Sequence, residues 1–80
     1  MHVCSRRDLS WRTVPEGWAL HCYGRHDAVL HVVPDTVHPG MWRVRCPDGA
    51  LTDTANLTWA RDGALSIALA MLNQQVEVAA

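Results

Sequence analysis

The segment from Met41 to Leu72 constrains the fold most, because it contains the local signals of a strand, a tight turn and a capped helix. Bulky and polar side chains alternate through residues 41–46, which is the pattern of a strand with one buried face. Pro47-Asp48-Gly49 then predicts a bulged hairpin, since Pro fixes φ and Gly accepts a positive φ. A short return strand over residues 50–52 is expected to follow.

One amphipathic helix is predicted to begin near residues 57–59 and to end near residues 73–75. Asn56 or Thr58 is suited to accept a hydrogen bond from the free N–H groups of its first turn. The apolar residues of this stretch fall on one wide arc, so the helix has an apolar face that must be buried. Residues 76–80 are expected to be a frayed tail or a stub of extra strand.

Two further strand patterns precede this segment, over residues 18–23 and 28–33. Gly24-Arg25-His26-Asp27 is the turn between them, and residues 34–40 form a loop bracketed by prolines. Such short connections favour an antiparallel meander whose apolar face is covered by the helix. The predicted fold class is therefore α+β: an antiparallel three- to four-stranded meander with one C-terminal helix packed on one face, a β-β-β-(β)-α two-layer sandwich.

The 80 residues are expected to form a single domain, 1–80, because a chain of this length has no room for a second core. Residues 1–15 are predicted to be an irregular N-terminal segment, with Trp11 as an anchor on the core. The core is expected to combine one face of each strand with one face of the helix. Its predicted members are Trp18, Leu20, Leu30, Val32, Trp42, Val44, Leu65, Ala68, Leu69 and Leu72.

The composition is that of an ordered globule, with 49% hydrophobic and 19% charged residues and a net charge of −1. No apolar run reaches the roughly 18 residues that a membrane-spanning helix needs, so no membrane association is expected. The N-terminus lacks the uninterrupted apolar core of a signal peptide. The cytoplasm of a bacterial cell is therefore the predicted location, and a monomer is the expected state.

The three cysteines and five histidines do not have the spacing of a zinc site, so no metal and no cofactor are expected. Cys22 and Cys46 lie on predicted buried faces, where a thiol acts as a small hydrophobe. Whether they are bridged depends on the strand register, which the sequence leaves open. Cys4, His26 and Asp27 supply the residue types of a nucleophile, a base and an acid, but they lie in predicted loops with nothing to hold them together. The chain is therefore not predicted to be an enzyme.

The open face of the sheet is the remaining candidate for function. It is expected to mix Arg, Tyr and Met with apolar side chains, a composition enriched at protein–protein contacts. An ordinary solvated sheet face is the alternative, because antiparallel sheets commonly leave one face wet. The predicted partner-binding residues are Arg43, Arg45, Tyr23, His21, His31 and Met41.

A sheet backed by one helix, with Trp42, Arg43 and Arg45 on a strand and a helix led by Thr58, is similar to the AP2-type DNA-binding domain. That resemblance implies a small regulator whose sheet lies in the major groove. The charge balance disfavours direct nucleic-acid binding, since the chain has seven arginines, no lysine and eight carboxylates. A local concentration of Arg6, Arg7, Arg12 and Arg25 stays open as the alternative. DNA binding is therefore the second hypothesis.

Four short stretches resemble sequences of short proteins from alphaproteobacterial chromosomes and prophages. They are Trp42-Arg43-Val44, Pro47-Asp48-Gly49, Asn56-Leu57-Thr58 and Ala60-Arg61-Asp62. A small, single-domain, non-catalytic protein of this kind is similar to the inhibitors that phages encode, of which anti-CRISPR proteins are the best-known class. The resemblance implies a non-enzymatic inhibitor that binds a Cas surveillance complex, specifically type I-C Cascade, and blocks access to target DNA. A steric plug is expected rather than a phosphate mimic, because the net charge is only −1.

Overall fold

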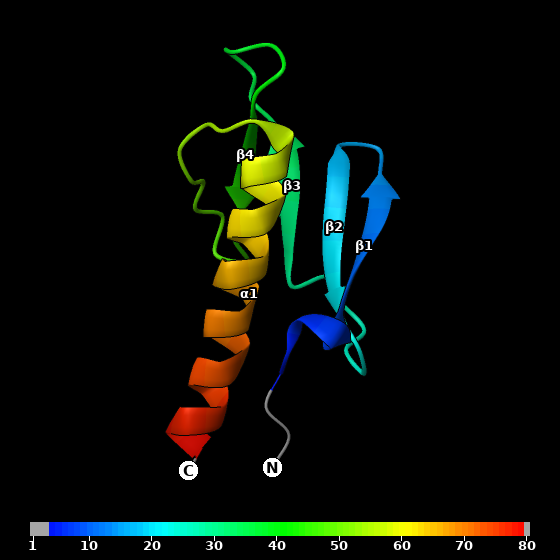
Figure 1. The fold of residues 1–80 in the computed structure, drawn as a ribbon, viewed down its shortest axis with the longest axis vertical. Coiled ribbons are helices and arrows are strands. Elements are labelled where there is room, and N and C mark those ends of the chain that lie inside the picture. The colour runs from blue at the N-terminus through cyan, green and yellow to red at the C-terminus, as the bar shows by residue number, and fades with distance from the viewer. Residues whose placement is uncertain (1–3, 80) are drawn as a thin grey trace.

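The computed structural model describes residues 4–79, with side chains through residue 74, and shows two layers, a sheet and one long helix (Figure 1). The four strands lie in the order β1-β2-β3-β4, and each pairs antiparallel with the next. This confirms the predicted α+β fold. The elements are the 3-10 turn η1 (Arg6–Asp8), β1 (Leu9–Val14), β2 (Gly17–Cys22), β3 (Leu30–Pro34), β4 (Trp42–Arg45) and α1 (Leu57–Ala79).

The prediction that residues 1–15 are irregular is wrong for residues 9–14. They form β1, which pairs with β2 along its whole length, from Leu9 opposite Cys22 to Val14 opposite Gly17. The sequence of this segment carries only a weak strand signal, because polar residues are frequent in it. Hydrogen bonds to β2 hold it in the extended conformation. Residues 1–3 lie outside the described part of the chain.

The turn after β4 forms as predicted, with Gly49 at φ 91° and its N–H donating to the carbonyl of Cys46. The expected return strand over residues 50–52, however, is reduced to isolated bridges. The reason lies at Thr52, whose Oγ1 accepts the Val44 N–H at 2.9 Å in place of a backbone carbonyl. A side chain therefore interrupts the ladder that a regular fifth strand requires.

Helix α1 begins at Leu57, where Asn56 Oδ1 accepts the Trp59 N–H at 2.9 Å and confirms the predicted cap. It continues to Ala79, so the predictions of an end near residues 73–75 and of a frayed or strand-like tail are wrong for the described residues. No Gly or Pro occurs in residues 73–79, so no helix-ending residue stands there. A helix of 23 residues is about 34 Å long. It extends beyond the sheet in Figure 1.

The core is closed by a stripe of small side chains on the helix. Ala60, Ala64, Ala68 and Leu72 recur every fourth residue and are all buried against the sheet. Leu20, Leu30, Val32 and Val44 are buried from the strand side. Leu65, Trp18 and Trp42 pack at the edge of this core, but Leu69 lies outside it, which corrects its assignment. Alanines occupy the helix side of the core, where the sequence pattern predicted Leu69, because small side chains let the helix backbone approach the sheet closely.

Helix α1 packs mainly on β3 and β4, as Figure 1 shows, and a second contact joins it to β1 and β2. The Arg61 guanidinium lies 5.0 Å from the ring centre of Trp11 and 4.8 Å from that of Trp18. These are cation–π distances, so Arg61 links the helix to the half of the sheet that the alanine stripe does not reach. Trp11 is an anchor as predicted, although it lies on a strand. Within residues 4–79, no helix has the combined length and apolarity that crossing a membrane demands.

Candidate functional site

The sheet face opposite the helix carries a row of polar side chains that crosses all four strands. Arg12 pairs with Ala19, Ala19 with His31, and His31 with Arg45. Cross-strand partners point to the same face, so the two arginines and the histidine lie in one line. Ala19 is only 1% exposed. The longer side chains of its cross-strand neighbours, Arg12 and His31, cover it. The open face therefore presents charged and polar groups above a buried alanine.

Arg43 belongs to an internal network centred on Asp35. Its Nε donates to Asp35 Oδ1 at 2.6 Å, and its NH1 donates to the Thr52 carbonyl at 3.0 Å. The His38 backbone N–H donates to Asp35 Oδ2 at 2.7 Å, and the His38 ring contacts the same oxygen. The Asp35 side chain is 3% exposed. This network ties the loop after β3 to β4, so Arg43 has a structural task within the chain.

Arg45 is also paired. Its two terminal nitrogens lie 3.2 and 3.3 Å from the two carboxylate oxygens of Glu16. This bidentate contact lowers the pKa of Glu16, first through the hydrogen bond and then through the charge of Arg45. Both arginines that the sequence predicts as binding groups therefore face carboxylates of their own chain. They also line a groove of about 440 Å³ whose other walls include Val33, Val37 and Leu51.

Acid is expected to destabilise the protein through Asp35. The hydrogen bond from Arg43, with further bonds from His38, holds the Asp35 pKa well below its ordinary value of 3.8. A lowered folded-state pKa stabilises the fold fully above the unfolded value. That stability is therefore lost as the pH falls from about 4 into the strongly acidic range. Thermal unfolding between pH 3 and 7, in wild-type protein and in Asp35→Asn, measures this loss.

In Asp35→Asn, we expect a lower Tm at pH 7 and a flatter decline below pH 4. Glu16→Gln is the matched control, because its carboxylate pairs with an arginine at a more exposed position. Parallel pH profiles for the wild type and Asp35→Asn would show that another group controls acid unfolding.

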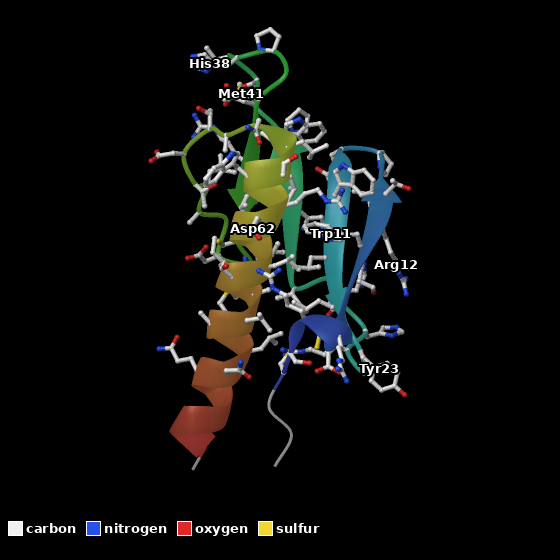
Figure 2. All side chains as sticks on the ribbon, in the orientation of Figure 1. Trp11, Arg12, Tyr23, His38, Met41 and Asp62 are labelled. Carbon is white, nitrogen blue, oxygen red and sulfur yellow. The ribbon has the colours of Figure 1, made fainter. Side chains whose placement is uncertain are left out.

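The other predicted partner-binding residues lie apart from one another. Tyr23 follows β2 and is 87% exposed at one end of the sheet, whereas Met41 precedes β4 at the opposite end (Figure 2). His21 and His31 lie on the open face between them. The structure therefore does not gather the six predicted residues into one patch. Arg43 and Arg45 line the groove described above, and His21 and Tyr23 line a second hollow at the Tyr23 end, whereas His31 and Met41 line neither.

We call this second hollow, lined by Arg7, Arg12, His21, Tyr23 and Arg25, the arginine hollow. Its volume is about 280 Å³, and Asp8, Ser10, Cys22 and Gly24 complete its wall. Among the described residues, the side chains of Arg7, Arg12 and Arg25 have no ion-pair or hydrogen-bond partner. The remaining arginines are committed elsewhere: Arg6 to Asp62, Arg43 to Asp35, Arg45 to Glu16 and Arg61 to two tryptophan rings.

One of these arginines, Arg12, acts on the nearby His21. Partial burial, the charge of Arg12 and that of His31 all lower the His21 pKa from its ordinary value. Burial contributes most to this lower pKa, and the positive charge of Arg12 acts in the same direction. Three arginines and one carboxylate, that of Asp8, line the hollow of a chain whose net charge is −1. An acidic group placed there would find arginines that no described ion pair already engages.

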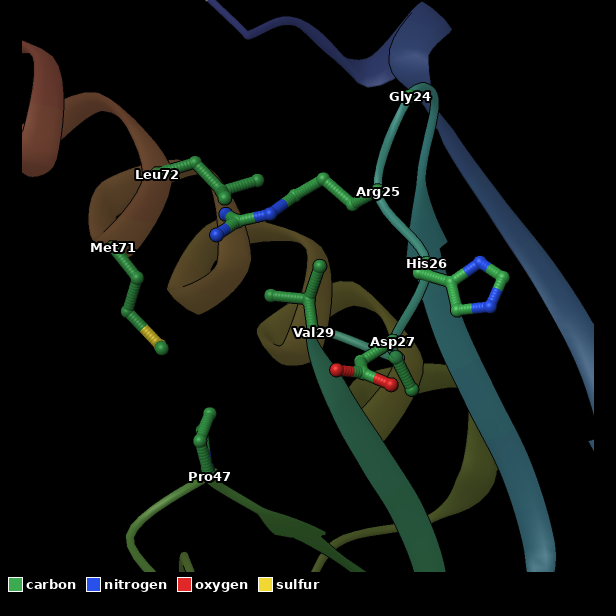
Figure 3. Close-up of a pocket in the computed structure, with 9 residues that line it drawn as sticks. Gly24, Arg25, His26, Asp27, Val29, Pro47, Met71 and Leu72 are labelled. Carbon is green, nitrogen blue, oxygen red and sulfur yellow. The ribbon is translucent and has the colours of Figure 1, made fainter.

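Arg25 forms the wall between the arginine hollow and a larger cavity of about 480 Å³ at the end of the sheet. In Figure 3 its guanidinium extends toward Leu72 of α1, while the His26 ring points away from the cavity. Val29, Met71 and Leu72 give this cavity an apolar lining. One arginine therefore serves two adjoining cavities, one lined by cations and one partly apolar.

Arg7, Arg12 and Arg25 were not among the predicted partner-binding residues, although a local concentration of them with Arg6 was left open; the structure pairs Arg6 with Asp62 instead. Their positions in a 3-10 turn, a strand and a loop share no local pattern. Sequence spacing gives no signal for them, because Asp8 adjoins Arg7 and Asp27 is two residues from Arg25, and only the fold shows which arginines remain unpaired. In the part of the chain that the structure describes, no three His, Cys, Asp or Glu side chains come together as metal ligands.

Comparisons with known proteins give no further identification. No family model matches the sequence, and neither the curated proteins nor the solved structures yield a match.

Proposed function

We propose that this chain is a small non-enzymatic inhibitor that binds an acidic surface of a protein partner through the arginine hollow. The observation that carries the proposal is a hollow that three arginines without an ion-pair partner line, beside the exposed Tyr23. Arginine and tyrosine are enriched among residues that dominate binding energy at protein interfaces. Unpaired guanidinium groups also offer planar, bidentate contacts to carboxylates.

The partner that we propose is a Cas surveillance complex, with type I-C Cascade as the specific candidate. This choice rests on the resemblance to small phage-encoded anti-CRISPR proteins. In this proposal the chain acts as a monomer in the cytoplasm of an infected bacterial cell. By covering an acidic surface next to the DNA path, it would block access to target DNA sterically, without chemistry and without a cofactor.

A sheet that binds DNA is the second candidate, favoured by the positive charge of Arg12 near His21 on the open face. Two features weigh against the AP2-like arrangement. Trp42 packs against the core, and Arg43, although it lies on the open face, is already bound to Asp35. Duplex-binding proteins commonly make about 6–10 phosphate contacts, which is more than three arginines supply.

Reversing one charge in the hollow is expected to weaken partner binding, because it sets like charges against an acidic surface. Arg12→Glu should raise the Kd for purified type I-C surveillance complex at least about tenfold, or roughly 1.4 kcal/mol. Arg45→Glu is the matched control, since it changes the net charge equally on the same face of the sheet. We expect its Kd to stay within about twofold of the wild type, because Arg45 already faces Glu16. Biolayer interferometry measures both values.

An equal loss in Arg45→Glu would move the binding site to the groove beside Arg43 and Arg45. Absence of any binding to the complex would contradict the Cas assignment. Capture of the tagged protein from its host, with and without nuclease, then distinguishes the two partner classes. Recovery of a protein complex after nuclease treatment supports the inhibitor, whereas recovery that depends on DNA supports the second candidate.

A further inference from the structure

Two cysteines far apart in the sequence lie side by side at the edge of the arginine hollow. The sulfur atoms of Cys4 and Cys22 are 3.7 Å apart, and both residues are half-buried. Cys22 ends β2 and lines the hollow, so solvent reaches it. The backbone of Cys4 is held in place by Asn73 of α1, whose side-chain amide accepts from the Cys4 N–H at 2.9 Å and donates to the Cys4 carbonyl at 3.1 Å.

The structure places Cys22 next to Cys4 and not next to Cys46, the partner that the sequence leaves open. Strand β3 separates β4 from β2, so Cys22 and Cys46 lie about 9 Å or more apart, beyond the roughly 7 Å that a disulfide spans. All three cysteines are free thiols in the structure. The sulfurs of Cys4 and Cys22, by contrast, need to approach by only about 1.6 Å to reach a bond length near 2.05 Å. Side-chain rotation alone can supply a movement of that size.

We propose that Cys4 and Cys22 form a redox-active dithiol that closes to an intramolecular disulfide by exchange with a low-molecular-weight disulfide. The Cys22 thiolate attacks one sulfur of the small disulfide and releases one small thiolate. Cys4 then loses its proton and attacks the Cys22 sulfur, which releases the second small thiolate. The protein loses two protons and two electrons, and the small disulfide gains both to become two thiols.

The surroundings of Cys4 define its part in this sequence. Burial, the hydrogen bond to Cys22 and nearby negative charge raise the pKa of Cys4 to about 11. Cys4 is therefore protonated at neutral pH and acts in the second step, as the resolving thiol. The disulfide would link the segment before η1 to the end of β2. It would thus fix Arg7 of η1 relative to Arg25 and Tyr23, a consequence for binding that rests on the proposed function.

Incubation of the reduced protein with oxidised glutathione tests the proposal. Intact mass and peptide mapping should show a monomer that lacks two hydrogen atoms and contains a Cys4–Cys22 linkage, reversed by dithiothreitol. Cys46→Ser is the control and should form the same linkage, whereas Cys4→Ser should stop at a glutathione adduct on Cys22. Closing a loop of this length should raise the Tm of the oxidised protein by roughly 10 °C.

A stable glutathione adduct on Cys22 of the wild type, a linkage to Cys46, or no reaction would each overturn the dithiol proposal. These readouts do not involve a partner, so they stand or fall separately from the inhibitor hypothesis. The affinity of the oxidised and reduced proteins for the surveillance complex is a second measurement. Equal affinities of the two forms would show that the disulfide does not affect partner binding through the arginine hollow.

Discussion

Leu20→Ala is expected to lower the free energy of unfolding by about 2–5 kcal/mol. Leu20 has no exposed surface and lies on β2 in the middle of the core. Removing its side chain takes away buried apolar area and leaves a cavity that neighbouring strands can fill only partly. Domains of this size are stable by only about 5–15 kcal/mol, so this loss is a large share of the total. Urea unfolding followed by tryptophan fluorescence measures it.

Leu69→Ala is the matched control for this substitution. The sequence pattern places Leu69 in the core, but the structure leaves it outside the core cluster on α1. The same chemical change should therefore cost less than half as much as Leu20→Ala. If both variants unfold at the same urea concentration, the helix faces the sheet with a different side from the alanine stripe described above.

Gly17→Ala is expected to destabilise the fold by about 3 kcal/mol or more. Gly17 begins β2 with φ 141°, a conformation that side chains disfavour. A Cβ at this position would also collide with the backbone carbonyl oxygen of Val32, and it would press on the Trp42 ring. Backbone atoms of a central strand cannot move aside cheaply, so β2 and β3 would have to separate locally.

Gly63→Ala provides the opposite control on α1, where an added Cβ meets no neighbouring atom. Alanine stabilises a helix interior by about 1 kcal/mol relative to glycine. Chemical unfolding of the two variants should therefore give changes of opposite sign. A Gly17→Ala protein that unfolds like the wild type would show that β2 and β3 do not approach as closely as described.

Charge pairing explains why the predicted binding residues and the arginine hollow differ. Arg43 and Arg45 alternate on one strand and so share a face, which the sequence pattern predicts. Their partners are Asp35 and Glu16, and Glu16 lies 29 positions away in the sequence. Reversing Arg43 to Glu would place a like charge beside the enclosed Asp35. That change would disturb the fold before it informed on binding, so Arg12 is the better residue to test.

Locally encoded features were determined by the sequence itself: the α1 N-cap, the turn at residues 47–49, three of the strands and the meander that short connections impose. Each depends on residues within a few positions of one another, where periodicity and turn chemistry act directly. The tertiary structure alone decided that residues 9–14 are a strand, which arginines remain unpaired, and that Cys4 meets Cys22. These outcomes depend on partners brought together by folding, and their distance along the chain leaves no local pattern to read.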